Sequence, residues 1–166
     1  KTFCIGKKTL VAFSGGKGSQ CCYHLCEDAG VDFKAQYSIT RFEPPELIAF
    51  IRKNYSDVTF RRAYKKSLVE EIADIGLPNR WFRWCCDAKH RKTQGFDIAV
   101  IGVRAAESAR RAANWRTFGR KRDGSYYVCP IFDWTDADVW EYLNSKSIPH
   151  CSLYDEALNK MSSSGI

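Results

Sequence analysis

Hydrophobic and polar positions in the first part of the chain alternate between short β-prone runs and helical repeats. Residues 9–13 form a short apolar, β-prone run, and 33–39 contains enough apolar and β-prone residues for a second strand, so each stretch predicts a strand. Residues 20–26, after the first run, are expected to be helical. After the second run, apolar residues recur at helical spacing through 45–55, directly behind two prolines that suit a helix start. A short strand is predicted at 58–60, so strands and helices alternate from the beginning of the chain.

The clearest helix boundaries lie in the middle of the chain. Ser67 and Glu70 have the spacing of a capping box, in which each residue satisfies a backbone N–H near the other. Gly76 and Pro78 are stop signals for the same helix. The apolar positions between these signals predict a stripe buried against the core, formed by Leu68, Val69, Ile72 and Ile75.

Two strand signals follow in the second half. Residues 97–103 form a continuous apolar run, which is typical of a parallel strand buried on both faces. The Asp123-Gly124 pair is a turn signal between 117–118 and 126–132. This pattern predicts a hairpin with basic residues at its tip.

A last helix is predicted behind Thr135 and Asp138, which again have capping-box spacing, and its apolar face includes Val139, Trp140 and Leu143. Strands that alternate with helices indicate an α/β protein with a mainly parallel, twisted sheet flanked by helices. A length of 166 residues suits a single domain over 1–166 that is large enough to bury a core.

The glycine-rich stretch between the first strand and its helix carries the strongest candidate chemistry. It consists of Ser14, Gly15, Gly16, Lys17, Gly18 and Ser19. Glycines let the backbone approach a phosphate closely, and the free N–H groups of the first helical turn point toward it. Lys17 adds an ammonium group and the serines add hydroxyls. An ordinary βα turn is the alternative, but the flanking strand and helix favour the phosphate site.

Composition narrows the class of ligand. The formal net charge of +7 favours anionic ligands, either nucleotides or nucleic acid. No apolar stretch reaches the length of a membrane span, and the first residues lack the apolar core of a signal peptide, so a cytoplasmic protein without a membrane partner is expected. Eight cysteines in such a protein are expected to be thiols, metal ligands or core residues rather than disulfides.

Residues 79–92 do not fit an ordinary core element, because aromatic and basic side chains are mixed with two adjacent cysteines. Cys85 and Cys86 are the best candidates among the cysteines. A [4Fe–4S] cluster needs four thiolates, so two more would have to come from elsewhere, and free thiols are the alternative. Arg104 directly follows the 97–103 run, where α/β sheets place ligand-binding groups.

Five stretches occur in one order along the chain: VAFSGGKGS, RWCCDAK, IGVRAAESARR, PIFDWTDADVWEYL and IPHCSLYDEAL. Together they resemble the phosphoadenosine-phosphosulfate (PAPS) reductase family, within the adenine nucleotide alpha-hydrolase-like superfamily of PP-loop ATP pyrophosphatases. The resemblance extends from about residue 9 to residue 158. It implies the Rossmann-like fold of that superfamily and an adenine nucleotide as ligand: PAPS, adenosine phosphosulfate (APS) or ATP.

The resemblance also implies roles for individual residues. The nucleotide and its phosphates would be bound by Ser14, Gly15, Gly16, Lys17, Gly18, Ser19, Thr40, Gly102, Val103, Arg104, Ser108, Arg110 and Arg111. Arg83 and Lys89 would approach the anionic substrate. Cys85 or Cys86 would serve as the nucleophile or as a cluster ligand, with Lys17 also in the catalytic set.

Two departures from the family pattern affect the chemistry. The family loop usually has Asp where Gly18 stands, and that Asp helps to hold Mg²⁺ in members that split ATP. Its absence argues against a Mg²⁺ site, because a carboxylate is the natural ligand for this ion. The last residues also lack the C-terminal cysteines of related reductases. Either the chain is truncated or the redox step is altered or lost.

Three functions are therefore kept as hypotheses. The leading one is thiol-dependent reduction of activated sulfate to sulfite, with a thiol electron donor such as thioredoxin. The second is an ATP-dependent adenylating enzyme for sulfur insertion into nucleic acid, similar to DNA phosphorothioation proteins. The third is a nucleotide-binding module without catalysis.

Overall fold

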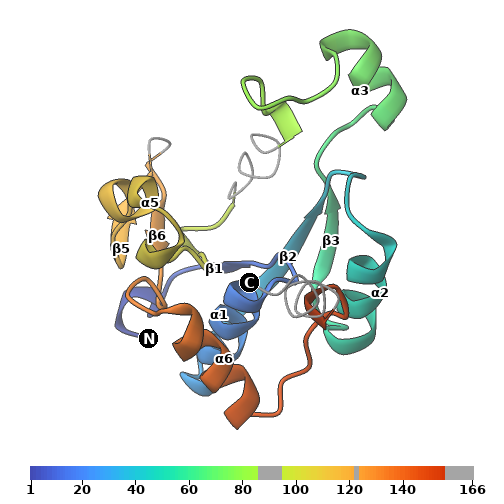
Figure 1. Cartoon of the computed structure of the whole chain (residues 1–166). Helices are drawn as coiled ribbons and strands as arrows, with labels where there is room; N and C mark the ends of the chain where they lie inside the picture. The colour runs from blue at the N-terminus through green and yellow to red at the C-terminus, as the bar shows by residue number, and fades with distance from the viewer. Residues whose placement is uncertain (86–94, 122–123, 156–166) are drawn as a thin grey trace.

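A six-stranded sheet with the strand order β3-β2-β1-β4-β6-β5 forms the centre of the molecule (Figure 1). The computed structural model describes residues 1–85, 95–121 and 124–155. The strands are β1 (Thr9–Ala12), β2 (Phe33–Ile39), β3 (Thr59–Arg62), β4 (Ile98–Val100), β5 (Phe118–Arg120) and β6 (Tyr126–Val128). All neighbouring pairs are parallel except β5 and β6, which are antiparallel. The expected mainly parallel α/β sheet is confirmed.

Three helices pack with the sheet into the main apolar core: α1 (Lys17–Asp28), α2 (Pro45–Asn54) and α6 (Asp136–Ser145). The strands contribute alternate residues, such as Ala35 and Tyr37 of β2, because successive side chains in a strand point to opposite faces. Ile51 of α2 and Val139 of α6 are fully buried in the same cluster. The predicted cap of α6 is present, since Thr135 accepts a hydrogen bond from the Asp138 backbone N–H.

The predicted burial of the helix at 68–75 is wrong. The helix itself is present as α3 (Leu68–Ile75), with the capping box of Ser67 and Glu70 in place and a positive φ at the Gly76 cap. It nevertheless buries no residue, and Val69 is 76% exposed. Figure 1 shows the reason: α3 extends away from the sheet, so its apolar face meets no strand. Apolar periodicity predicts which face of a helix is apolar, but it does not predict whether the helix packs against the sheet.

Short elements complete the described chain. They are the 3-10 helices η1 (Thr2–Cys4) and η2 (Ala105–Glu107) and the helix α5 (Ala109–Asn114). The predicted hairpin is confirmed by the antiparallel pairing of β5 with β6, although the 122–123 part of its turn lies outside the described residues. No helix in the described ranges has both the length and the apolar character needed to cross a membrane.

Candidate functional site

A cleft of about 430 Å³ opens beside β1. At this strand the order of the sheet reverses, because β2 and β3 are added on one side of β1 and β4 is added on the other. Both β2 and β4 are parallel to β1. The helices and loops that follow parallel strands diverge at such a point and leave a crevice. The cleft is lined by Ala12, Phe13, Ser14, Gly16, Lys17, Gly18, Ser19, Gln36, Tyr37, Ser38, Ile101, Gly102, Val103, Arg104, Glu107, Arg111, Lys121 and Tyr154.

The glycine loop is shorter than the sequence predicts, because α1 already begins at Lys17 with Gly16 as its N-cap. Gly15 has a φ of +73°, and a β-carbon there would lie 2.7 Å from Ile51 Cδ1. Only glycine meets both conditions without strain. Gly15 is therefore the point where the loop packs tightly against α2. Its neighbours Ser14 and Gly16 line the cleft.

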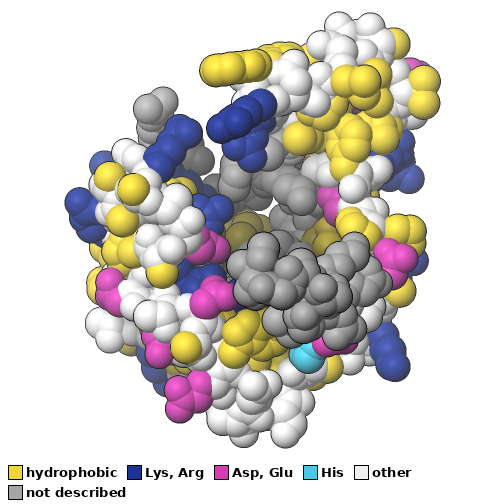
Figure 2. Space-filling view, viewed as in Figure 1, with side chains coloured by type: hydrophobic (Ala, Val, Ile, Leu, Met, Phe, Trp, Pro, Cys, Tyr) yellow, Lys and Arg dark blue, Asp and Glu magenta, His cyan; other side chains and the backbone are white. Residues whose placement is uncertain are grey.

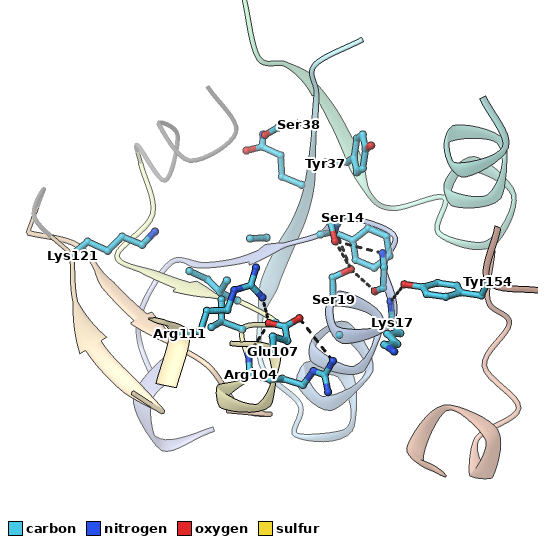
Figure 3. Close-up of a pocket in the computed structure, with 18 residues that line it drawn as sticks. Ser14, Lys17, Ser19, Tyr37, Ser38, Arg104, Glu107, Arg111, Lys121 and Tyr154 are labelled. Carbon is cyan, nitrogen blue, oxygen red and sulfur yellow. Dashed lines mark hydrogen bonds and ion pairs between the residues drawn. The ribbon is translucent and has the colours of Figure 1, made fainter. Parts of the chain in front are cut away.

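Hydrogen bonds within the loop fix its shape. The Ser19 hydroxyl accepts a hydrogen bond from the Ser14 backbone N–H at 3.1 Å and donates one to the Gly16 carbonyl at 2.8 Å. The Ser14 hydroxyl also donates to Ser19 Oγ at 3.1 Å. Figure 3 shows this serine pair beside the start of α1. The loop thus holds its conformation without a ligand.

The first N–H of α1 also has a partner from the far end of the chain. The Lys17 backbone N–H donates to the Tyr154 hydroxyl at 3.0 Å (Figure 3). Helix N-termini carry unsatisfied N–H groups and a partial positive charge, which is why they bind anions. Here the electron-rich oxygen of Tyr154 takes one of these positions.

Two cations meet on one carboxylate at the rim of the cleft. Lys17 Nζ lies 2.5 Å from Asp136 Oδ2, and Arg104 Nη2 lies 2.6 Å from Asp136 Oδ1. Lys17 and then Arg104 hold the pKa of the Asp136 carboxyl below its usual value, since both stabilise the ionised form. Lys17 and Arg104, both candidates from the sequence, therefore lie close together and are joined through an acid.

Arg104 is a buried cation. Its residue is 4% exposed, and its Nε and Nη1 atoms have no hydrogen-bond partner among the described residues. A buried guanidinium with unused donors is costly unless an anion satisfies them. Next to it, Arg111 forms an ion pair with Glu107, and Lys121 of the hairpin also lines the cleft (Figure 3).

The structure brings together only part of the predicted site. Thr40 is buried and donates its hydroxyl to Glu43, and Ser108 caps α5 by accepting from the Arg111 backbone N–H. These two residues, Arg83 and Arg110 do not line the cleft. Cys86 and Lys89 lie outside the described residues.

Polar residues of the site that the sequence did not indicate include Lys121 and Tyr154, which line the cleft, and Asp136, which contacts Lys17 and Arg104 at its rim. Asp136 follows the helix cap Thr135, a position where acids commonly serve the helix dipole, so its type gives no signal of a ligand role. Lys121 belongs to a basic hairpin tip, which is usually solvated. Tyr154 lies in the IPHCSLYDEAL stretch, but an aromatic residue in such a stretch is more often part of the packing.

Most described cysteines are buried, protonated thiols. Burial raises the pKa of Cys21 and of Cys129 to about 11 and that of Cys26 to about 12, and it raises the pKa of Cys22 well above its usual value. All four are packed in the apolar core: Cys21, Cys22 and Cys26 belong to the main core cluster, and Cys129 belongs to the cluster with Tyr127 and Phe132. Cys85 is partly exposed and does not line the cleft.

Metal ligation was tested on the part of the chain that the structure describes. No group of three or more His, Cys, Asp or Glu side chains gathers there in a way that could hold a metal ion. Gly18, which stands where the family loop usually has Asp, lies against Gly102. Glu107 in the cleft and Asp136 at its rim are both paired with cations. The described residues therefore do not fit a Mg²⁺ site or a complete [4Fe–4S] cluster.

Comparison with known proteins gives a consistent result. The family model of the phosphoadenosine phosphosulfate reductase domain matches residues 8–161. An uncharacterized protein of Methanocaldococcus jannaschii is 29% identical over 95% of this chain and 35% of its own length. The adenosine 5'-phosphosulfate reductase of Halalkalibacterium halodurans is 24% identical over 91% of this chain and 70% of its own length.

The fold has a solved counterpart. The phosphate complex of the PAPS reductase from Candida auris superposes with a TM-score of 0.61 and 16% identity, over 90% of this chain and 77% of that chain. The likeness supports the Rossmann-like α/β fold. The chain spans about half the length of several other adenosine 5'-phosphosulfate reductases that it matches.

Proposed function

Because the chain belongs to the phosphoadenosine phosphosulfate reductase domain family, we propose that its cleft binds an adenine nucleotide that carries activated sulfate, PAPS or APS. The observation that carries this proposal is the convergence of the glycine loop, the N-terminus of α1 and buried Arg104 on one cleft. A volume of about 430 Å³ lies within the usual range of small-molecule sites.

The cleft divides into an anionic and an apolar part. Lys17, Arg104 and Arg111 neutralise the phosphate and sulfate groups in this proposal, and the positive N-terminal end of α1 attracts the same anions. On the opposite side, Phe13 and the β2 residues 36–38 form the wall against which the adenosine packs. Thr40 and Ser108 then act indirectly, through Glu43 and the cap of α5.

The proposed reaction is thiol-dependent reduction of the bound sulfate to sulfite. A thiolate attacks the sulfur atom, the sulfur–oxygen bond to the nucleotide breaks, and the adenosine phosphate leaves. A second thiol then displaces sulfite and forms a disulfide, so two thiols supply the two electrons. Cys85 or Cys86 is the candidate for the first thiol in this chain, and a thioredoxin-like donor would regenerate the thiols. No step runs through a metal cluster.

Titration calorimetry with PAPS, APS and ATP, each with and without Mg²⁺, tests the proposal. We expect PAPS or APS to bind without metal, and binding to weaken about tenfold or more in Lys17→Ala, because a charge-assisted hydrogen bond is lost. Lys146→Ala, which removes a lysine paired with Asp28 away from the cleft, is the matched control.

The same samples distinguish the alternative functions. Release of sulfite with a thiol donor under anaerobic conditions supports the reductase. Cleavage of ATP to AMP and pyrophosphate supports an adenylating enzyme instead, for which nucleic acid is the substrate to add. Nucleotide binding without either product supports a binding module. The proposal is refuted if none of the three nucleotides binds.

A further inference from the structure

Three cations of the cleft, Lys17, Arg104 and Arg111, are paired with carboxylates of the chain itself. Asp136 bridges Lys17 and Arg104 with contacts of 2.5 and 2.6 Å, and Glu107 pairs with Arg111. A ligand anion that uses Lys17 and Arg104 must therefore take the place of the Asp136 carboxylate or share its partners. The Asp136 side chain is 63% exposed, so it can turn outward into water when it is replaced.

We propose that Asp136 occupies the anion subsite formed by Lys17 and Arg104 and thereby keeps free inorganic phosphate and sulfate out of it. This inference rests on the proposed function of the cleft. A nucleotide bearing phosphate or sulfate differs from the free ions only in the groups attached to them, so a site with bare cations would bind both.

The geometry explains how a carboxylate can exclude the free ions while a nucleotide still binds. A small anion that enters the subsite gives up part of its hydration and gains only the two cations, while the chain loses two short charge-assisted hydrogen bonds to Asp136. The exchange therefore brings little net free energy. A nucleotide adds contacts with the loop and with the wall formed by Phe13 and β2, and these contacts favour it over the carboxylate.

Burial of Arg104 makes this competition effective. A pair between two exposed charges contributes little. The Arg104 side chain is only 5% exposed, however, and two of its nitrogens have no partner among the described residues. Its contact with Asp136 is thus the short bond of a largely desolvated cation, which a weakly interacting ion does not readily replace.

The test measures binding of inorganic phosphate, inorganic sulfate and AMP to four forms of the full chain by titration calorimetry. These are the wild type, Asp136→Asn, Asp136→Glu and the control Glu141→Gln, which removes one exposed carboxylate from the same helix outside the cleft. Asp136→Asn should bind phosphate and sulfate at least about tenfold more tightly than the wild type. AMP should gain affinity by a similar factor, because its phosphate displaces the same carboxylate, but the wild type should already bind AMP and should not bind phosphate or sulfate measurably.

Asp136→Glu should restore the exclusion of phosphate, and Glu141→Gln should resemble the wild type. Asp136→Ser, which suits the start of a helix, gives the same test if the asparagine variant does not fold. The inference is overturned if the folded variants bind phosphate no more tightly than the wild type. If PAPS and APS bind to none of the forms but Asp136→Asn gains phosphate affinity, the proposed function fails while occupation of the anion subsite by Asp136 is supported.

Discussion

Gly102 lies against the backbone of Gly18 so closely that a β-carbon on Gly102 would be 2.7 Å from the Gly18 carbonyl carbon. The contact joins the residue pair that follows β4 to the first turn of α1. Both segments line the cleft, and the absence of side chains at both positions lets their backbones meet.

Gly102→Ala should destabilise the protein by about 1–3 kcal/mol, because the new methyl group overlaps with backbone atoms that cannot move independently. Gly18→Ala should cost less, since its β-carbon would lie 3.1 Å from the Gly102 carbonyl oxygen. Urea unfolding of both variants checks the order. Equal stability of wild type and Gly102→Ala would show that the two segments separate easily.

Arg104→Lys should weaken nucleotide binding about tenfold or more, even though the charge is kept. Lysine has one compact ammonium group and cannot reproduce the planar, multi-donor contact of a guanidinium. Arg110→Lys is the matched control, because Arg110 is exposed and does not line the cleft. Calorimetric titration of both variants with PAPS or APS gives the comparison, and equal affinities would remove Arg104 from the proposed anion site.

Replacement of apolar residues should have opposite outcomes in α3 and α2. Val69→Ser in α3 should change the free energy of unfolding by less than about 0.5 kcal/mol, because the side chain is already 76% exposed. Ile51→Ala in α2 should cost about 2–5 kcal/mol, since it leaves a cavity in the core. Chemical denaturation measures both values. A large loss for Val69→Ser would mean that α3 is covered in solution.

These two positions also show how far the sequence determines the fold. Local signals located the helices, their caps and the strands well, because capping boxes, prolines and apolar periodicity act over a few residues. The capping box of Ser67 and Glu70 is present as predicted. Burial of Val69 was not predictable in this way, since it depends on the path of 61–67 relative to the sheet, which no local pattern encodes.

The candidate site divides in the same manner. The glycine loop and Arg104 were identifiable, because each has a chemistry suited to anions and follows a predicted strand. Asp136 and Tyr154 reach the loop from more than 100 positions away, and they do so through tertiary packing of α6 and the segment after it. A capping acid and a packing tyrosine have ordinary explanations in the sequence, so only the fold shows that they contact Lys17.

Acid should reduce the stability that Asp136 contributes. Its pKa in the folded protein lies below the usual 3.8, so the contribution is complete above pH 3.8 and is lost as the pH falls through the lower folded value. The difference in unfolding free energy between the wild type and Asp136→Asn should therefore be constant from pH 7 to 5 and shrink below pH 4. A difference that does not change with pH would show that the carboxylate is not stabilised by Lys17 and Arg104.

Thiol labelling should separate Cys85 from the core cysteines. Iodoacetamide at pH 8 should modify Cys85 and Cys4 before the core cysteines in the folded protein, because both are partly exposed. Cys22 and Cys26 should react only after unfolding, since burial keeps them protonated. Peptide mass spectrometry before and after addition of urea measures the order, and early modification of Cys22 would contradict the described core.

The hydrogen bond from the Lys17 N–H to the Tyr154 hydroxyl joins residues 137 positions apart, and this has a consequence for synthesis on the ribosome. The glycine loop leaves the exit tunnel early, whereas the side chains that satisfy it, Asp136 and Tyr154, are among the last of the described chain to be made. A nascent chain therefore exposes its anion loop before its own partners exist.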